Sequence, residues 1–89
     1  MLNLILTGRF QKDYKRVEKR SKDVDKLWVV VGMLITGKKL PERYRDHTLK
    51  GNYVGRRECH LEPDWLLIYK VEERDLILER TGSHADLFE

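Results

Sequence analysis

Residues 53–80 read YVGRRECHLEPDWLLIYKVEERDLILER, and their pattern sets the fold class. Three segments, residues 53–60, 65–71 and 76–80, are rich in aromatic and branched side chains, which favours extended strands. The short polar turns EPD and EERD separate these segments. Because strands with such short connections pair with their sequence neighbours, the stretch predicts a three-stranded antiparallel meander.

The chain before the meander changes to a helical period. Residues 2–6 (LNLIL) alternate and predict a short first strand. Thr7 then offers an N-cap hydroxyl to a helix whose apolar residues recur at helical spacing from 10 to 17. A second apolar face over residues 24–35, followed by Gly37 as a stop signal, predicts a second helix. Together the two helices form a hairpin that packs on the sheet.

The remaining segments complete the element order. Residues 38–51 contain Pro41 and predict an irregular loop. After the last strand, Ser83 and Asp86 have the spacing of a capping box, so a single helical turn ending at Phe88 is expected. The order β-α-α-β-β-β with a short C-terminal helical turn places the chain in the α+β class, as one domain over residues 1–89.

Composition narrows the functional classes. Hydrophobic residues at 40% and charged residues at 37% are typical of a folded, soluble domain. No apolar run approaches the roughly 20 residues of a membrane span, and the first residues lack the basic start of a signal peptide. The single cysteine, Cys59, has no partner for an internal disulfide. We therefore expect a cytoplasmic protein that does not bind a membrane.

Charge is distributed unevenly along the chain, whose net charge is +3. Residues 9–26 hold 8 Lys or Arg against 4 Asp or Glu, and residues 36–58 hold 7 against 3. From residue 59 onward the balance reverses to 3 against 8. Two basic regions around one cleft would attract a polyanion, so the asymmetry favours RNA or DNA as a partner. Charged helix faces that are simply solvated would give the same counts.

Topology brings several reactive side chains to one edge of the predicted sheet. His60 and Asp64 flank the first hairpin turn. Arg80 and His84 lie at the end of the strand that pairs with residues 65–71. Since antiparallel order returns that end to the beginning of its neighbour, we expect Asp64, Trp65, Arg80 and His84 to meet there.

This set suits cleavage of RNA by its own 2′-hydroxyl. A base must take the hydroxyl proton, a cation must stabilise charge on the phosphate, and an acid must protonate the leaving 5′-oxygen. Histidine titrates near neutral pH and serves as either acid or base. Arginine holds phosphate oxygens through two N–H groups and keeps its charge. The chemistry requires no metal or other cofactor.

Each residue also has a purely structural interpretation. His47 fits a solvated loop, and His60 fits a residue that hydrogen-bonds its turn. Arg80 can pair with Glu79 or Glu62, and Trp65 belongs to the core if it points inward. Phe88, near the chain end, is as well explained by stacking on a base. Cys59 reads as a small buried residue, and its position next to His60 on a strand argues against a shared zinc site.

Three spaced segments carry a family resemblance. DHTLKG at residues 46–51, RECHLEPDWLLIY at 57–69 and RTGSHADLF at 80–88 resemble the signature segments of YafQ-type toxins in the RelE/ParE superfamily. The likeness extends over the whole chain in length and element order, and it is sharpest after Arg45. It implies a RelE-like fold, ribosome-dependent cleavage of mRNA, and neutralisation by a cognate antitoxin.

The resemblance also implies roles for individual residues. It places His47, His60, Asp64 and His84 among the acid/base residues, Arg80 on the phosphate, and Trp65, Phe88 and Lys50 with the substrate. Our hypothesis takes His47 or Asp64 as the base and His84 as the acid, with His60 in support. Further basic residues on the first helix are expected to contact ribosomal RNA and an acidic antitoxin segment: Lys12, Lys15, Arg16 and Lys19.

Three other functions remain open on this sequence. A ParE-like gyrase inhibitor would share the fold but lack an acid/base cluster. A non-catalytic RNA-binding module would use the same basic faces and tolerate loss of His84. A free-standing ribonuclease would degrade naked RNA without the ribosome.

Overall fold

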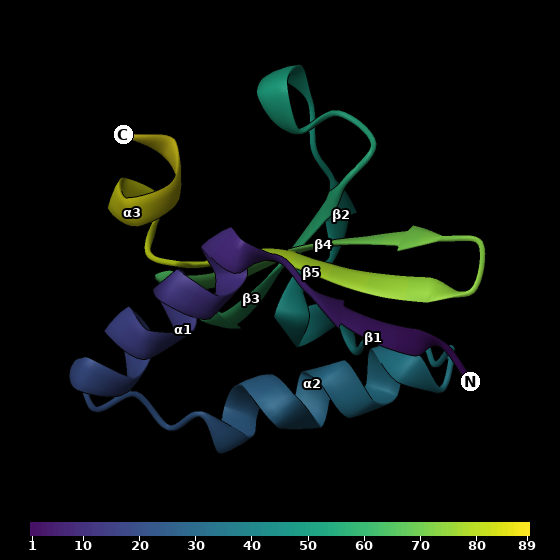
Figure 1. Cartoon of the computed structure of the whole chain (residues 1–89), viewed down its shortest axis with the longest axis horizontal. Coiled ribbons are helices and arrows are strands. Elements are labelled where there is room, and N and C mark those ends of the chain that lie inside the picture. Colours follow the sequence, from purple (N-terminus) through teal and green to yellow (C-terminus); the bar gives the residue numbers. More distant parts are fainter.

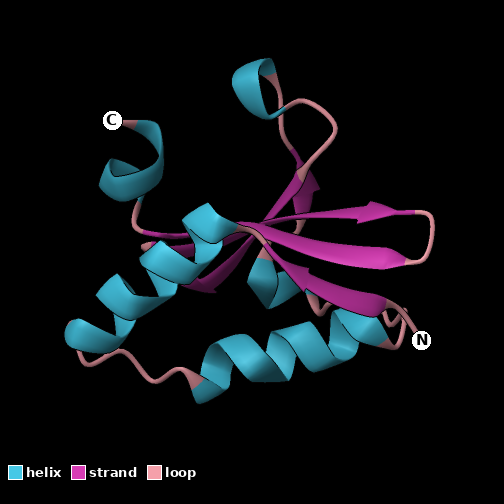
Figure 2. Cartoon of the chain, in the orientation of Figure 1, coloured by secondary structure: helices cyan, strands magenta, loops and turns pink.

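The computed structural model describes residues 1–89 and arranges them around a five-stranded sheet (Figures 1 and 2). The strands are β1 Asn3–Leu6, β2 His47–Thr48, β3 Arg57–Glu62, β4 Trp65–Glu72 and β5 Asp75–Gly82. Their order in the sheet is β1-β5-β4-β3-β2, with β1 parallel to β5 and every other pair antiparallel. The predicted meander and the α+β class are confirmed.

Two helices, α1 Gly8–Lys19 and α2 Asp25–Ile35, form the predicted hairpin. The Thr7 hydroxyl caps α1 by accepting a hydrogen bond from the Phe10 amide at 3.0 Å. In Figure 1, α2 runs below the sheet, whereas the C-terminal helix α3, His84–Phe88, rises above it. The apolar faces of α1 and α2 pack against one face of the sheet and form the main core with it. None of the helices has both the length and the apolar character needed to cross a membrane.

Strand β4 is buried on both of its faces. Trp65, Leu67 and Tyr69 belong to the main core beside α1 and α2. Leu66 and Ile68 alternate with them and pack against Leu87 of α3 in a second, smaller cluster. Because side chains alternate along a strand, β3 residues paired with Leu66 and Ile68 share this second face. We call it the open face, since only the short helix α3 and the loop before β3 cover part of it (Figure 1).

Helix α3 is fixed at its first turn. Ser83 and Asp86 form the predicted capping box, each side chain accepting the other residue's amide. Asp86 also accepts two hydrogen bonds from Arg20 of α1, at 2.6 and 3.1 Å. Gly82 permits this close packing, because a Cβ there would lie 2.9 Å from the Asp86 Cβ. The chain end is therefore held against α1.

The loop before the meander is longer and more ordered than predicted. It contains β2 and two 3₁₀ turns, η1 Glu42–Tyr44 and η2 Gly51–Tyr53. The expected start of the strand at Tyr53 is wrong, since β3 begins at Arg57. Gly51 and Gly55 adopt positive φ of 66° and 86°, which breaks the extended conformation on both sides of Tyr53. Tyr53 thereby turns toward the open face and its cluster.

A β-bulge in β5 decides where Arg80 points. Leu78 pairs with Tyr69 on the core face, whereas Arg80 pairs with Ile68 on the open face, so Glu79 is the extra residue between them. In a regular strand Leu78 and Arg80 would share one face. The bulge therefore moves Arg80 from the core side to the open face.

Candidate active site

Five aromatic rings form a row across the open face, and we call it the ring row. His47 lies 6.3 Å from His60, His60 lies 6.0 Å from His84, His84 lies 5.9 Å from Phe88, and Phe88 lies 5.6 Å from Tyr53, measured between ring centroids. Strand β2, strand β3, helix α3 and turn η2 supply them. All three histidines of the chain are thus neighbours: His60 and His84 as the antiparallel topology predicts, and His47 as the family resemblance implies.

Asp64 orients His84. Its Oδ1 atom accepts a hydrogen bond from the His84 amide at 3.0 Å and lies 3.1 Å from the ring Nδ1. The amide hydrogen bond first, and the ring contact second, lower the pKa of Asp64. Since Asp64 stays a carboxylate, Nδ1 carries the hydrogen of that contact, and Nε2 is left to exchange protons with a ligand. Both side chains are open to solvent, at 54% and 69% exposure.

His47 is held between two acceptors. Its Nδ1 lies 2.6 Å from the Arg45 carbonyl oxygen, and its Nε2 lies 3.1 Å from Oε2 of Glu58. A carbonyl oxygen can only accept, so Nδ1 carries a hydrogen, and Nε2 is the nitrogen that can gain or lose a proton beside the Glu58 carboxylate. The loop thus fixes the His47 ring in place and sets a negative charge beside Nε2.

Glu58 is a member of the site that our sequence analysis missed. Its side chain is buried, and its Oε1 atom has no hydrogen-bond partner, the one such atom among the buried side chains. The signal was its position two residues before His60 on β3, which puts both side chains on the open face. A buried carboxylate oxygen without a hydrogen-bond partner is uncommon in a protein interior, and this favours a functional role for the charge of Glu58.

Arg80 lies on the open face, but its guanidinium is already bound. Nε and Nη2 donate to the two carboxylate oxygens of Asp13 at 2.6 and 3.1 Å. These hydrogen bonds raise the pKa of Arg80. The partners expected from the sequence are wrong, because Glu79 pairs with Arg56 and Glu62 pairs with two lysines of the helical hairpin. Arg80 therefore has a structural role besides any contact with substrate.

Trp65 does not face the site. Its side chain is 1% exposed in the main core, and its indole Nε1 donates to the Thr81 hydroxyl at 3.0 Å. The expectation that Trp65 contacts the substrate is wrong, because its even alternation with Leu66 sends the ring toward the helices. Trp65 therefore packs on the core face of the sheet, opposite the site. Cys59 is buried as predicted, and burial raises its pKa to about 12.

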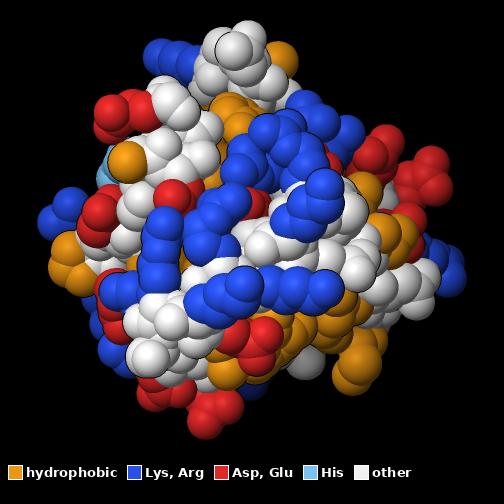
Figure 3. All heavy atoms as spheres, turned by 60° about the vertical axis from the view of Figure 1, so that its left-hand side comes forward, with side chains coloured by type: hydrophobic (Ala, Val, Ile, Leu, Met, Phe, Trp, Pro, Cys, Tyr) orange, Lys and Arg blue, Asp and Glu red, His pale blue; other side chains and the backbone are white.

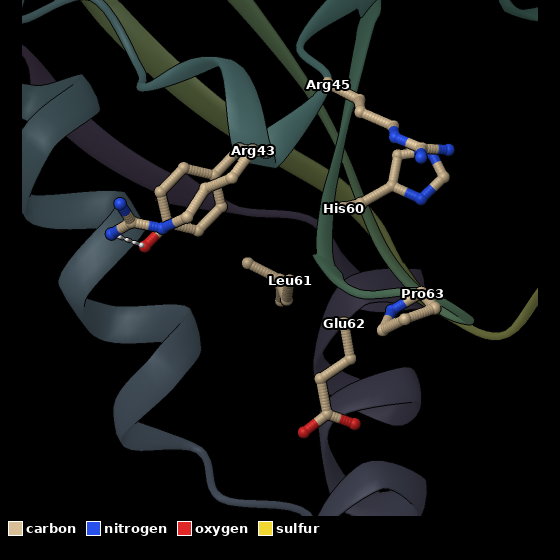
Figure 4. Close-up of a pocket in the computed structure, with 7 residues that line it drawn as sticks. Arg43, Arg45, His60, Leu61, Glu62 and Pro63 are labelled. Atoms are coloured by element: carbon tan, nitrogen blue, oxygen red, sulfur yellow. Dashed lines mark hydrogen bonds between the residues drawn. The ribbon is translucent and has the colours of Figure 1, made fainter.

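Lys50 and Phe88 line the same hollow at one end of the ring row, together with Tyr53 and Arg9. Phe88 is 45% exposed, so its ring is available to a ligand. At the other end of the row, His60 lines a smaller pocket with Arg45 (Figure 4). Lys and Arg side chains also gather across the middle of the face seen in Figure 3. The ring row therefore connects two basic hollows.

The side chains of the site are not arranged as a metal centre. No group of three or more His, Cys, Asp or Glu residues is placed to hold a metal ion. What the arrangement offers is proton transfer between imidazoles and carboxylates beside fixed cations. These features define a small α+β domain whose open face can transfer protons beside fixed cations.

Comparison with known proteins gives the family. The model for "Bacterial toxin of type II toxin-antitoxin system, YafQ" matches residues 2–89. The mRNA interferase toxin YafQ of Escherichia coli K12 is 47% identical over 83 residues, which cover 92% of this chain and 90% of the relative. This chain belongs to the YafQ family of toxins.

Solved structures agree with this assignment. YafQ in the E. coli DinJ-YafQ complex superposes with a TM-score of 0.92 at 43% identity, covering 100% of both chains. A metal-bound toxin from Helicobacter pylori gives 0.93 at 44% identity, covering 99% of this chain and 100% of the other. The RelE-like fold inferred from the sequence is confirmed.

Proposed function

We propose that this chain cleaves mRNA on the ribosome, with the ring row as its active site, and that a cognate antitoxin neutralises it. The observation that carries the proposal is the approach of three histidines, one of them oriented by Asp64, on an exposed face. The E. coli relative is named an mRNA interferase, and a second relative was crystallised with DinJ as a toxin–antitoxin complex. The first name supports cleavage of mRNA, and the complex supports neutralisation by an antitoxin.

The geometry favours His47 over Asp64 as the base. Two hydrogen bonds from His84 hold the pKa of Asp64 low, which makes it a weak proton acceptor. His47, with its hydrogen on Nδ1, takes the proton of the 2′-hydroxyl at Nε2, and the adjacent Glu58 carboxylate stabilises the charged ring. This arrangement leaves Asp64 to orient the acid.

His84 then protonates the leaving 5′-oxygen through Nε2, since its Nδ1 is committed to Asp64. His60 lies between the His47 and His84 rings, with centroids 6.3 and 6.0 Å from theirs. Arg80 contributes charge through the N–H groups that Asp13 leaves free. No step passes through a metal.

Dependence on the ribosome follows from the shallow site. The ring row is open to solvent and encloses no substrate, so a second surface must position the RNA. The exposed cations of α1, among them Lys12, Lys15 and Lys19, offer phosphate contacts to ribosomal RNA. The same surface suits an acidic antitoxin segment.

Mapping of mRNA ends on programmed ribosomes tests the proposal. The wild-type chain should cut, His84→Ala should reduce cutting by about 100-fold or more, as expected for a lost general acid, and Arg74→Ala in the β4–β5 turn should cut normally. A chelator selective for transition metals, with Mg²⁺ kept for the ribosomes, should leave the cuts unchanged. Retained cutting by His84→Ala would refute the assignment, and equal cutting of naked RNA would refute ribosome dependence. Intact transcripts with inhibited gyrase would favour the ParE-like alternative.

A further inference from the structure

Several cations of this chain are neutralised by carboxylate partners. Basic residues that make ion pairs with carboxylates include Arg16, Arg20, Lys22, Lys26, Arg56, Arg57 and Arg80. Arg45 differs from them. Its guanidinium makes no ion pair and no hydrogen bond, although it lines a pocket together with His60. A free cation beside a reactive imidazole is available to a ligand.

The backbone of Arg45 explains why its side chain reaches this position. Arg45 ends the turn η1 in the left-handed conformation, with φ 49° and ψ 43°, which non-glycine residues seldom adopt. In this conformation its amide donates to the Glu42 carbonyl at 2.9 Å, and its own carbonyl accepts from His47 Nδ1 at 2.6 Å. One residue thus fixes His47 by its backbone and faces His60 by its side chain.

The pocket has room and positive charge for an anion. Its volume is about 250 Å³, with Arg45 and His60 on one side and Arg43 on the other (Figure 4). Arg43 is held over the Tyr44 ring, 4.7 Å from its centroid. The pocket's carboxylate, Glu62, accepts hydrogen bonds from two lysines at 2.8 Å each, which compensate its charge. The two guanidinium groups therefore give the pocket a positive charge.

We infer that Arg45 binds the RNA phosphate on the 5′ side of the scissile one, so that the strand enters over Arg45 and leaves over Phe88. The inference rests on the proposed function, because it uses the assignment of base and acid. The 2′-hydroxyl belongs to the 5′ nucleotide, and the leaving 5′-oxygen belongs to the 3′ nucleotide. His47 as base and His84 as acid therefore order the nucleotides along the ring row.

The opposite end of the row fits the 3′ side. There Lys50 and Arg9 make no ion pair, and the half-buried ring of Tyr53 and the exposed ring of Phe88 stand edge to face around the same hollow. Exposed aromatic rings stack on bases, and free cations bind the phosphates between them. The two ends thus differ in their aromatic rings: the upstream pocket has no free ring, whereas the downstream hollow has the rings of Tyr53 and Phe88 beside Arg9 and Lys50.

The test uses a short RNA with a 2′-deoxy sugar at the cleavage position, which cannot be cut. In two versions, a neutral methylphosphonate replaces the phosphate just upstream or just downstream of the scissile one. Affinity is measured by fluorescence anisotropy over a range of salt for wild type, Arg45→Asn, Arg45→Lys and the control Arg74→Gln. Asparagine tolerates the left-handed backbone, so the first variant removes charge and leaves the turn.

For wild type, neutralising either phosphate should weaken binding. Arg45→Asn should lower the salt slope by about 0.7, the value for one phosphate contact on a single strand. It should also become insensitive to the upstream methylphosphonate alone, while Arg45→Lys keeps part of the effect. Wild-type binding by Arg45→Asn, equal loss of both sensitivities, or no binding of any RNA would overturn the inference. Oriented binding without cleavage on ribosomes would instead refute the nuclease and leave the phosphate contact standing.

Discussion

Replacing Asp13 with alanine separates the structural role of Arg80 from its role at the site. The Asp13 carboxylate accepts hydrogen bonds from Arg80 Nε, Arg80 Nη2 and the Thr81 amide, at 2.6, 3.1 and 3.2 Å. The two side chains are 3% and 10% exposed, so solvent replaces little of what is lost. Alanine leaves a guanidinium and an amide without a partner in the interior.

Breaking such a buried pair by removing one partner destabilises a protein by about 3 to 5 kcal/mol. A domain of 89 residues has a free energy of unfolding of roughly 4 to 13 kcal/mol at typical values per residue. The substitution therefore removes a large part of the stability. Each kcal/mol lowers Tm by about 4 to 8 °C in a domain of this size, so we expect Tm to fall by about 12 to 40 °C.

Urea unfolding of five chains measures the effect: wild type, Asp13→Ala, Asp13→Leu, Arg80→Met and the double variant of Asp13→Leu with Arg80→Met. If the charges matter mainly to each other, the double variant should be more stable than Asp13→Leu by a few kcal/mol, because no unpaired charge remains. Cutting of mRNA by the double variant, at a temperature where it is folded, then reports the contribution of Arg80 to catalysis alone. A loss below about 1 kcal/mol in Asp13→Leu, set against the 3 to 5 expected for a buried pair, would refute the buried-pair reasoning.

Three further substitutions test other contacts of the fold and of the site. Trp65→Phe removes the indole hydrogen bond to Thr81 and should lower the free energy of unfolding by about 1 to 2 kcal/mol in urea, with mRNA cutting retained by the folded chain. Arg20 holds the pKa of Asp86 below its ordinary 3.8, so the carboxylate stabilises the fold above that pH and the contribution is lost as pH falls through the lower folded value. Asp86→Asn should flatten this acid limb of the unfolding free energy, measured by thermal melts. Glu58→Gln keeps the shape and removes the charge beside the base, so cutting should fall by about 10-fold or more, with a shifted pH profile.

The sequence predicted what depends on local pattern and on strand order. The meander, the helical hairpin and the capping box of Ser83 follow from periodicity and cap residues. The meeting of Asp64 with His84 follows from antiparallel topology, because a hairpin returns one strand end to the start of its neighbour. His47 was expected from the family resemblance, and β2 brings it beside His60.

Other features depend on contacts that no local pattern encodes. The bulge at Glu79 reverses the face of Arg80, and strict alternation would have placed that side chain in the core. Its partner Asp13 lies 67 positions away on a helix whose rotation the sequence does not fix. The sequence shows Glu58 only as a charged residue on a strand. Its burial depends on the tertiary contact with His47, which local pattern does not encode.

The distinction between paired and free cations changes what the charge of this chain means for RNA binding. Exposed pairs such as Lys26 with Glu62 contribute at most about 1 kcal/mol, so a phosphate can take the place of the carboxylate. Breaking the buried pair of Arg80 with Asp13 costs more than an exposed pair does, so Arg80 would contact RNA while it remains bound to the Asp13 carboxylate. Arg45 gives up no partner when it binds a phosphate. The salt dependence of binding should therefore follow Arg45 more closely than Arg80, although a count of charges along the sequence treats the two as equal.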